Sequence, residues 1–330
     1  MADKSNIQWT EATWNPIAGC SIASTGCRNC YAMAHAARLE RIGLIKYANL
    51  TTESKAGPVW SGNVALDERS LDQPMRWRRP RLIFVNSMSD LFHEALSDAQ
   101  IDRVFAAMAL SPQHTLQVVT KRSARMRSYL GDPDTKFRIA QAALRVGSDL
   151  PHGHPGWKKS NWRVAGDGTK PAVVPRWPLP NLWMGVSVED QDAADARIGD
   201  LEASPAALRF ISAEPLLGEI DLQLADSDGF RLRSIDWVIV GGESGPRART
   251  CRVEWITDLV RQCRNAAVPV FVKQLGARYL DERDFVGGAA IRLPAEAGRD
   301  LTRRLKHRKG ADMAEWPEYL RVQQMPEVRA

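Results

Sequence analysis

The chain has 330 residues, of which 44% are hydrophobic and 25% are charged, and its formal net charge is +6. This composition is that of an ordinary folded protein, and it excludes a collagen, a coiled coil and a wholly disordered chain. No apolar run approaches the roughly 20 residues of a membrane-spanning helix, and the N-terminal segment lacks the apolar core of a signal peptide. We therefore expect a cytoplasmic protein without a membrane partner.

The first predicted strand, near residues 13–18, leads into a loop that contains three of the five cysteines. Cys20, Cys27 and Cys30 lie within eleven residues, in the sequence WNPIAGCSIASTGCRNCYA. An odd, low and uneven cysteine count does not suit a disulfide framework and favours a cytosolic metal or redox site. We interpret the two remaining cysteines as ordinary buried thiols. They are Cys251 and Cys263.

Three thiolates from one short loop can hold three irons of a [4Fe–4S] cluster and leave the fourth iron open. Gly19 and Gly26 let the backbone wrap closely around such a bulky group. Residues 31–44 predict a helix, whose positive N-terminal end would lie at Cys30 and favour a thiolate. A structural zinc site is the alternative, but it takes four ligands, and His35 lies on a poor helical face to be the fourth. A third possibility is that the loop binds no metal.

Short apolar runs along the chain predict the strands of a sheet. Continuous runs of this kind are typical of strands buried on both faces, and therefore of a parallel sheet. Helical periodicity lies between them, most clearly at Ala99–Ala109 and Val253–Ala267. We predict the α/β class, a partial (β/α)6-type barrel with mainly parallel strands, plus an insertion and a C-terminal extension. After the first strand, the runs are Leu82–Asn86, Leu116–Thr120, Leu182–Val188, Leu208–Ser212, Trp237–Val240 and Val268–Val272.

Polar or glycine residues follow nearly every predicted strand. Because the C-terminal ends of parallel strands meet at one mouth, where barrel sites form, we expect these residues to line a cofactor-binding site. Loops are polar in any protein, so each residue could equally belong to an ordinary surface loop. The candidates are Ser87, Ser89, Asp90, Lys121, Ser187, Glu189, Glu214, Gly241, Gly242 and Glu243.

Two of these candidates have a second interpretation. Asp90 could cap the segment that follows it instead of contacting a ligand. Glu214 follows an apolar strand, where an unpaired charge is unfavourable, so we expect it to pair with Lys121, Lys273 or a ligand.

Residues 131–180 interrupt the alternation of strands and helices. The segment is rich in glycine and proline and has no obvious buried strand, so we interpret it as an insertion or lid. Residues 289–330 are predicted to form a C-terminal cap. Because no convincing linker divides the chain, we expect residues 1–330 to form one domain with this insertion.

Basic residues gather in several short segments, which is compatible with DNA, RNA or another polyanion as a partner. A solvated basic surface would look the same in sequence. The segments are Arg76–Arg81, Lys121–Arg127, Arg247–Arg252 and Arg303–Lys309.

Motifs along most of the chain, from about residue 5 to 325, together resemble a phage and bacterial "three-Cys-motif" protein family of unknown function. That family is distantly similar to radical S-adenosylmethionine enzymes, spore photoproduct lyase among them. The motifs are IQWTEATWNPIAGC, GCRNCYA, PRLIFVNSMSDLFHE, TLQVVTKRSARM, PLPNLWMGVSVEDQ, RFISAEPLLG, WVIVGGESGPRAR and VPVFVKQLG.

The resemblance implies that the three loop cysteines bind a [4Fe–4S] cluster whose open iron chelates S-adenosylmethionine. Reductive cleavage would then yield a 5′-deoxyadenosyl radical that abstracts hydrogen from a substrate, plausibly a nucleic acid undergoing modification or repair. An electron donor such as flavodoxin or ferredoxin is also implied, as are contacts of Ser87, Ser89 and Asp90 with the methionine amino group. The cysteine spacing, x6 then x2, departs from the x3 then x2 usual in radical enzymes.

Two other functions remain open. The chain could be a non-catalytic iron–sulfur or zinc protein that binds nucleic acid. It could also be a divalent-metal hydrolase or nuclease that uses acidic side chains at the strand ends. Those side chains are Asp90, Glu189, Glu214 and Glu243.

Overall fold

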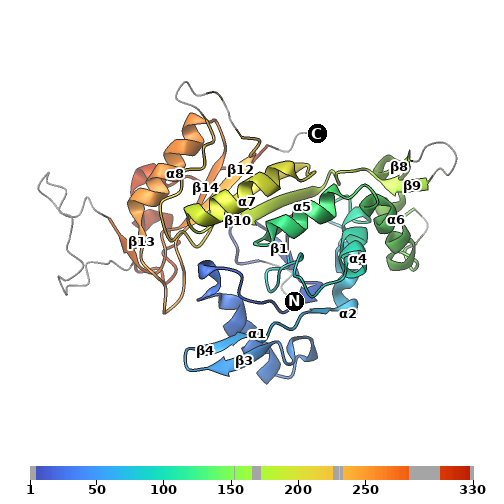
Figure 1. Ribbon diagram of the computed structural model, residues 1–330, viewed down its shortest axis with the longest axis horizontal. Coiled ribbons are helices and arrows are strands. Elements are labelled where there is room, and N and C mark those ends of the chain that lie inside the picture. The colour runs from blue at the N-terminus through green and yellow to red at the C-terminus, as the bar shows by residue number, and fades with distance from the viewer. Residues whose placement is uncertain are drawn as a thin grey trace, which may run out of the picture. The chain divides into compact units, whose positions relative to one another are not determined.

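The computed structural model describes residues 5–151, 153–165, 172–225, 230, 233–281 and 305–327. Its main sheet has seven strands in the order β1-β6-β7-β10-β11-β12-β14. Of these, β1, β10, β12 and β14 are labelled in Figure 1. These strands are β1 (Ala12–Trp14), β6 (Leu82–Val85), β7 (Thr115–Thr120), β10 (Leu182–Ser187), β11 (Leu208–Ala213), β12 (Trp237–Gly241) and β14 (Val270–Gln274).

The predicted α/β class, a partial barrel with mainly parallel strands, is confirmed. β1 pairs with β6, β6 with β7, β7 with β10 and β12 with β14, each time in parallel. Every residue of β10 and of β12 is buried, as the continuous apolar runs predicted. β6 instead alternates between buried and half-buried residues, so one of its faces is less covered.

Helices follow the strands in the alternation that the periodicity predicted. α4, which follows β6, begins with a capping box in which Ser97 Oγ accepts from the Gln100 N–H and Gln100 Oε1 accepts from the Ser97 N–H. The longer helices are α1 (Tyr31–Arg41), α4 (Asp98–Ala109), α5 (Ser123–Gly131), α6 (Thr135–Val146), α7 (Gln191–Ala203) and α8 (Val253–Asn265). Two short helices, α2 (Glu68–Leu71) and α3 (Gln73–Arg76), precede β6. None of the helices in the described residues is long and apolar enough to span a membrane.

The chain divides into two compact units. The first unit comprises Met1–Ser187 and Asp195–Phe210, and the second comprises Val188–Ala194 and Ile211–Ala330. Whether the whole chain acts as one domain stays a prediction.

Small strand pairs surround the main sheet. In the first unit, β2 (Ile17–Ala18) pairs with β5 (Ala65–Leu66), and β3 (Thr51–Ser54) pairs with β4 (Gly57–Trp60). The β3–β4 hairpin lies beside α1 (Figure 1). In the second unit, β13 (Cys251–Arg252) pairs with β15 (Tyr279–Leu280).

The segment predicted as an insertion contains regular structure where it is described. It holds α6 and an antiparallel hairpin of β8 (Trp162–Ala165) and β9 (Ala172–Pro175). The buried carboxylate of Asp102 on α4 anchors the start of this segment, because it accepts from Tyr129 Oη at 2.7 Å and from Arg138 Nε at 3.3 Å. A role of the segment as a lid stays a prediction.

The C-terminal segment runs along β14 in the second unit. The Val272 N–H donates to Val322 O at 2.8 Å, and the Gln324 N–H donates to Val270 O at 3.0 Å. Within the predicted cap, residues 289–304 and 328–330 lie outside the described residues. The described part, residues 305–327, covers the edge of β14 with backbone hydrogen bonds.

Aromatic rings fill the interior of the first unit beside β10. Trp9 is buried, with its ring centroid 4.8 Å from that of Phe84 and 6.4 Å from that of Phe210. A Cβ at Gly185, in the middle of β10, would lie 2.7 Å from the Phe210 ring. The missing side chain therefore makes room for Phe210.

We expect Gly185→Ala to lower the free energy of unfolding by about 1–3 kcal/mol, because the added methyl group overpacks a filled interior. Gly199→Ala is the matched control, since Gly199 is exposed on α7 and an added Cβ meets no atom within 4 Å. That change should stabilise the helix by about 0.5–1 kcal/mol. Urea unfolding followed by circular dichroism measures both, and equal effects of the two changes would contradict the packing argument.

Candidate functional site

The cysteine loop is attached to the sheet at the end of β6. Gly19, directly before Cys20, has φ +91°, and a Cβ there would lie 2.1 Å from Asn63 O. Only glycine fits this position. Gly19 also forms a bridge with Ser89, and Ser89 Oγ donates to Ile17 O at 3.0 Å. The loop thus leaves β2 and passes beside the residues that follow β6.

The loop cysteines lie partly buried at the edge of a small apolar cluster. Cys20 and Cys30 pack against it, and Cys30 is the N-cap residue of α1. Cys27 ends a short 3₁₀ helix, Thr25–Cys27, and its carbonyl accepts from the Cys30 N–H at 3.1 Å. The cluster consists of Ala18, Ala32, Met33, Ala36, Tyr47, Leu50, Trp60 and Met88.

Burial strongly affects the loop thiols. It raises the pKa of Cys20 to about 12, and the charge of Asp90 acts in the same direction while that of Arg122 opposes it. Burial also raises the pKa of Cys30, against the effect of the Ala32 amide at the start of α1. A negative charge on Cys27 would raise both pKa values, so Cys27 lies within electrostatic range of each of the other two thiols.

A buried carboxylate, Asp90, lies beside the loop. Its Oδ1 accepts from Thr120 Oγ1 at 2.7 Å and from the Phe92 N–H at 3.0 Å. Its Oδ2 accepts from the Lys121 N–H at 3.0 Å and from Arg122 Nη1 at 3.1 Å. Four donors thus occupy the carboxylate, which joins the end of β6 to the end of β7. The predicted contact with a ligand amino group would have to replace one of these bonds.

Arg122 connects Asp90 to the cysteine loop. Its side chain is only 6% exposed, and its Nε donates to both carboxylate oxygens of Glu94. Nη1 lies 3.8 Å from Cys20 Sγ, and Nη2 donates to Ser21 Oγ at 2.7 Å. A fixed positive charge therefore lies against the first thiol of the loop.

The other predicted residues of the first unit lie at the same strand ends. Ser87 Oγ donates to Asn15 Oδ1 at 3.1 Å, and Tyr31 Oη donates to Ser87 O at 2.8 Å. Lys121 Nζ donates to Ser187 Oγ at 2.9 Å, which joins the end of β7 to the end of β10. The structure thus brings together the three cysteines and five of the ten predicted cofactor-binding residues.

The remaining five predicted residues belong to the second unit. Glu214 pairs with Lys273 at 2.5 Å, so the predicted pairing is confirmed and its partner is identified. Gln274 joins Glu214 to the glycine loop, residues 241–245. Its Nε2 donates to Glu214 Oε1 at 3.2 Å and to Gly242 O at 2.8 Å. Glu189 is fully buried.

Internal packing explains why positions 241 and 242 of the glycine loop are glycines. A Cβ at Gly242 would lie 2.3 Å from Leu275 O, and one at Gly241 would lie 3.3 Å from Gln274 Cγ. Glu243 accepts from Arg249 through both carboxylate oxygens. The loop therefore has structural reasons for its glycines, and a contact with a cofactor stays a prediction.

The sequence analysis did not single out Ser21 and His93, two polar residues of the first unit that the fold brings together at the cysteine loop. His93 Nε2 lies 2.9 Å from Ser21 Oγ, and burial, together with the charge of Arg122, lowers the pKa of His93. The signal that could have indicated them is their nearness in sequence to candidate residues: Ser21 directly follows Cys20, and His93 lies three residues after Asp90.

The donor set of the loop suits a soft, net-negative metal cluster. It offers three thiols at an apolar surface, a helix N-terminus at Cys30 and a guanidinium beside Cys20. Among the described residues, no group of three or more His, Cys, Asp and Glu side chains is arranged to hold a metal ion. The loop side chains would therefore have to change position to ligate one.

A family model described as "Protein of unknown function (DUF5131)" matches residues 4–317. No curated protein matches the chain. No solved structure matches it.

The five thiols should separate into two classes when the folded, metal-free chain is titrated with a thiol reagent. Cys20, Cys27 and Cys30 are partly exposed, whereas Cys251 and Cys263 are fully buried, so access of the reagent separates the two classes. We expect three thiols to react without denaturant and two to react only after unfolding. A Cys251→Ala/Cys263→Ala variant should lose the second class alone; a fast-reacting Cys251 would contradict the assignment.

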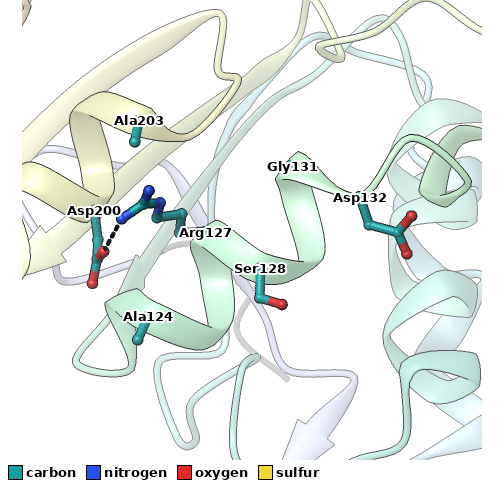
Figure 2. Close-up of a pocket in the computed structure, with 7 residues that line it drawn as sticks. All are labelled: Ala124, Arg127, Ser128, Gly131, Asp132, Asp200 and Ala203. Atoms are coloured by element: carbon teal, nitrogen blue, oxygen red, sulfur yellow. Dashed lines mark hydrogen bonds and ion pairs between the residues drawn. The ribbon is translucent and has the colours of Figure 1, made fainter.

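Arg122→Met should lower the free energy of unfolding by about 3–5 kcal/mol, because it leaves the buried Asp90 carboxylate without its cation. Arg127→Met is the control on the next turn of α5. Arg127 is exposed, and its ion pair with Asp200 of α7 spans 3.4 Å (Figure 2), so its loss should cost less than about 1 kcal/mol. Urea unfolding measures both variants. Adding Asp90→Asn to Arg122→Met should recover part of the loss, and strict additivity would speak against a coupled pair.

Proposed function

The chain belongs to the DUF5131 family, and we propose that it is an iron–sulfur enzyme whose three-cysteine loop holds a [4Fe–4S] cluster. Cys20, Cys27 and Cys30 would be the ligands. A cluster bound there would supply an electron for the reductive cleavage of S-adenosylmethionine, the chemistry that the resemblance to radical enzymes implies.

The observation that carries this proposal is the surroundings of the three thiols. Cys20 and Cys30 lie against apolar side chains, which keep water away from whatever the sulfurs bind. Arg122 lies 3.8 Å from Cys20 Sγ. Cluster ligation needs thiolates, and a nearby cation together with the N-terminus of α1 offsets the negative charge that thiolates bring. Three cysteines are also one ligand short of a structural zinc site.

The polar residues beside the loop have distinct roles in this proposal. Arg122 positions the loop, because it holds Ser21 with one nitrogen while Asp90 and Glu94 fix its own orientation. Asp90 acts as a positioning residue, since four protein donors already occupy its two carboxylate oxygens. Ser187 is the group that we assign to a contact with S-adenosylmethionine, as predicted from its place at a strand end, and Lys121 positions it by donating to Ser187 Oγ.

The enzyme would act on nucleic acid with a donor such as flavodoxin or ferredoxin. Support for a polyanionic substrate comes from exposed basic side chains such as Arg78 and Arg79, which precede β6. Arg81 stacks on the ring of Trp77, with the guanidinium 4.8 Å from the ring centroid. An arginine and an aromatic ring in one basic segment are typical of surfaces that bind nucleic acid strands.

Anaerobic reconstitution with iron, sulfide and reductant tests the proposal. We expect about four iron and four sulfide ions per chain, with the visible absorption of a [4Fe–4S] cluster. Replacing Cys20, Cys27 and Cys30 together by alanine should abolish iron binding. The matched control, Cys251→Ala/Cys263→Ala, should bind iron as the parent does, because both residues lie in the second unit and are buried.

The same reconstituted protein is then incubated with dithionite and S-adenosylmethionine. Formation of 5′-deoxyadenosine is the expected outcome. A cluster without that product would overturn the radical assignment alone. One zinc ion per chain and no iron–sulfur absorption would overturn the iron–sulfur assignment as well.

A further inference from the structure

A cavity of about 680 Å³ opens in the first unit beside the cysteine loop. Residues from the loop, from the start of α5 and from α7 line it. Its charged lining consists of four cations and two carboxylates, so the wall is net positive. These side chains are Lys121, Arg122, Arg125, Arg197, Glu94 and Asp200.

Ser21 also lines the cavity. The neighbours of its hydroxyl determine whether that hydroxyl donates or accepts a hydrogen bond. His93 Nδ1 accepts from the Ala95 N–H at 3.1 Å, so the hydrogen of the neutral imidazole lies on Nε2. Nε2 therefore donates to Ser21 Oγ at 2.9 Å, and Arg122 Nη2 donates to the same oxygen at 2.7 Å. Both acceptor positions of the hydroxyl are used, so its own hydrogen is left to be donated.

The two carboxylates of the wall already have donors. Glu94 accepts from Arg122 Nε through both oxygens, and Asp200 accepts from Ser123 Oγ at 2.8 Å. Two of the cations are held by one residue, because Lys121 donates to Ser187 Oγ and Arg197 donates to Ser187 O. The cation positions are thus set by the ends of the strands and do not depend on a ligand.

We propose that this cavity binds a phosphate group, with Ser21 Oγ–H and Lys121 Nζ as donors. An outward hydroxyl donor among several fixed cations suits a multiply charged oxyanion. The volume suits a ligand of nucleotide size, and Ile22, Ala124 and Ala196 supply apolar wall for its uncharged part. The phosphate belongs to a mononucleotide or to a nucleic acid strand, whose shared chemistry the site recognises.

This site does not require a metal, and only the statement that its ligand is the substrate rests on the proposed iron–sulfur function. A phosphate held here would place its carrier next to Ser21 and therefore next to Cys20. The basic wall would then select substrates before any chemistry begins.

Isothermal titration of the full metal-free chain tests the site with inorganic phosphate, AMP, adenosine and a short single-stranded oligonucleotide. We expect phosphate and AMP to bind and adenosine not to bind, with affinity falling as salt rises. Ser21→Ala and Lys121→Gln should each weaken AMP binding about tenfold, the effect of losing one hydrogen bond to a charged group. Arg145→Gln is the control, because Arg145 is exposed on α6 and lies outside the cavity lining, so this change should leave AMP binding unchanged.

Three outcomes overturn the proposal: no phosphate or AMP binding, equal binding of AMP and adenosine, or unchanged AMP binding in both variants. Thermal unfolding of each variant separates misfolding from a lost contact, and Lys121→Gln keeps the test valid if Ser21→Ala does not fold. Tighter binding of the oligonucleotide than of AMP would assign the phosphate to a strand, and the reverse would assign it to a mononucleotide. A chain that binds AMP through Ser21 but takes up no iron would overturn only the proposed enzyme function.

Discussion

The buried ion pair between Asp90 and Arg122 holds together the part of the first unit in which the candidate site lies. Removing both charges from water costs several kcal/mol, and such a pair forms only when further hydrogen bonds satisfy the remaining atoms. Here Thr120 and two backbone amides complete the coordination of Asp90, while Glu94 and Ser21 complete that of Arg122. The ends of β6 and β7 and the cysteine loop are therefore fixed relative to one another by one connected group of polar atoms.

This group adjoins two different environments. In the first, the thiols of Cys20 and Cys30 touch apolar side chains, which suit an uncharged or charge-delocalised group. Ser21 and Lys121 instead line a cavity whose charged side chains are net positive. Arg122 belongs to both, since one nitrogen of its guanidinium lies near sulfur and another holds the Ser21 hydroxyl. A ligand in either of them would change the electrostatic environment of the other through this residue.

The sheet could be predicted closely because its strands are continuous apolar runs, and β7 and β10 begin and end within one residue of the predicted ranges. The three cysteines and the strand-end residues of the first unit could also be predicted to lie together. The contacts of Ser21 could not, because its partners His93 and Arg122 are 72 and 101 positions away in the chain. Nor does sequence show that Asp90 already has four protein donors. The β8–β9 hairpin was missed because its strands are short and mostly not buried, so they lack the continuous buried apolar run that marked the other strands.

Cys30 belongs to two structures at once, since it is part of the loop and also the residue from which α1 starts. α1 in turn packs on the β3–β4 hairpin, and Met33, Ala36 and Trp60 share one apolar cluster with the thiols. Any ligand that binds the thiols of the folded loop more tightly than those of the unfolded chain must therefore stabilise this whole corner by mass action. Ligation and the local folding equilibrium of α1 are thermodynamically linked, so hydrogen exchange along the helix would report occupancy of the loop.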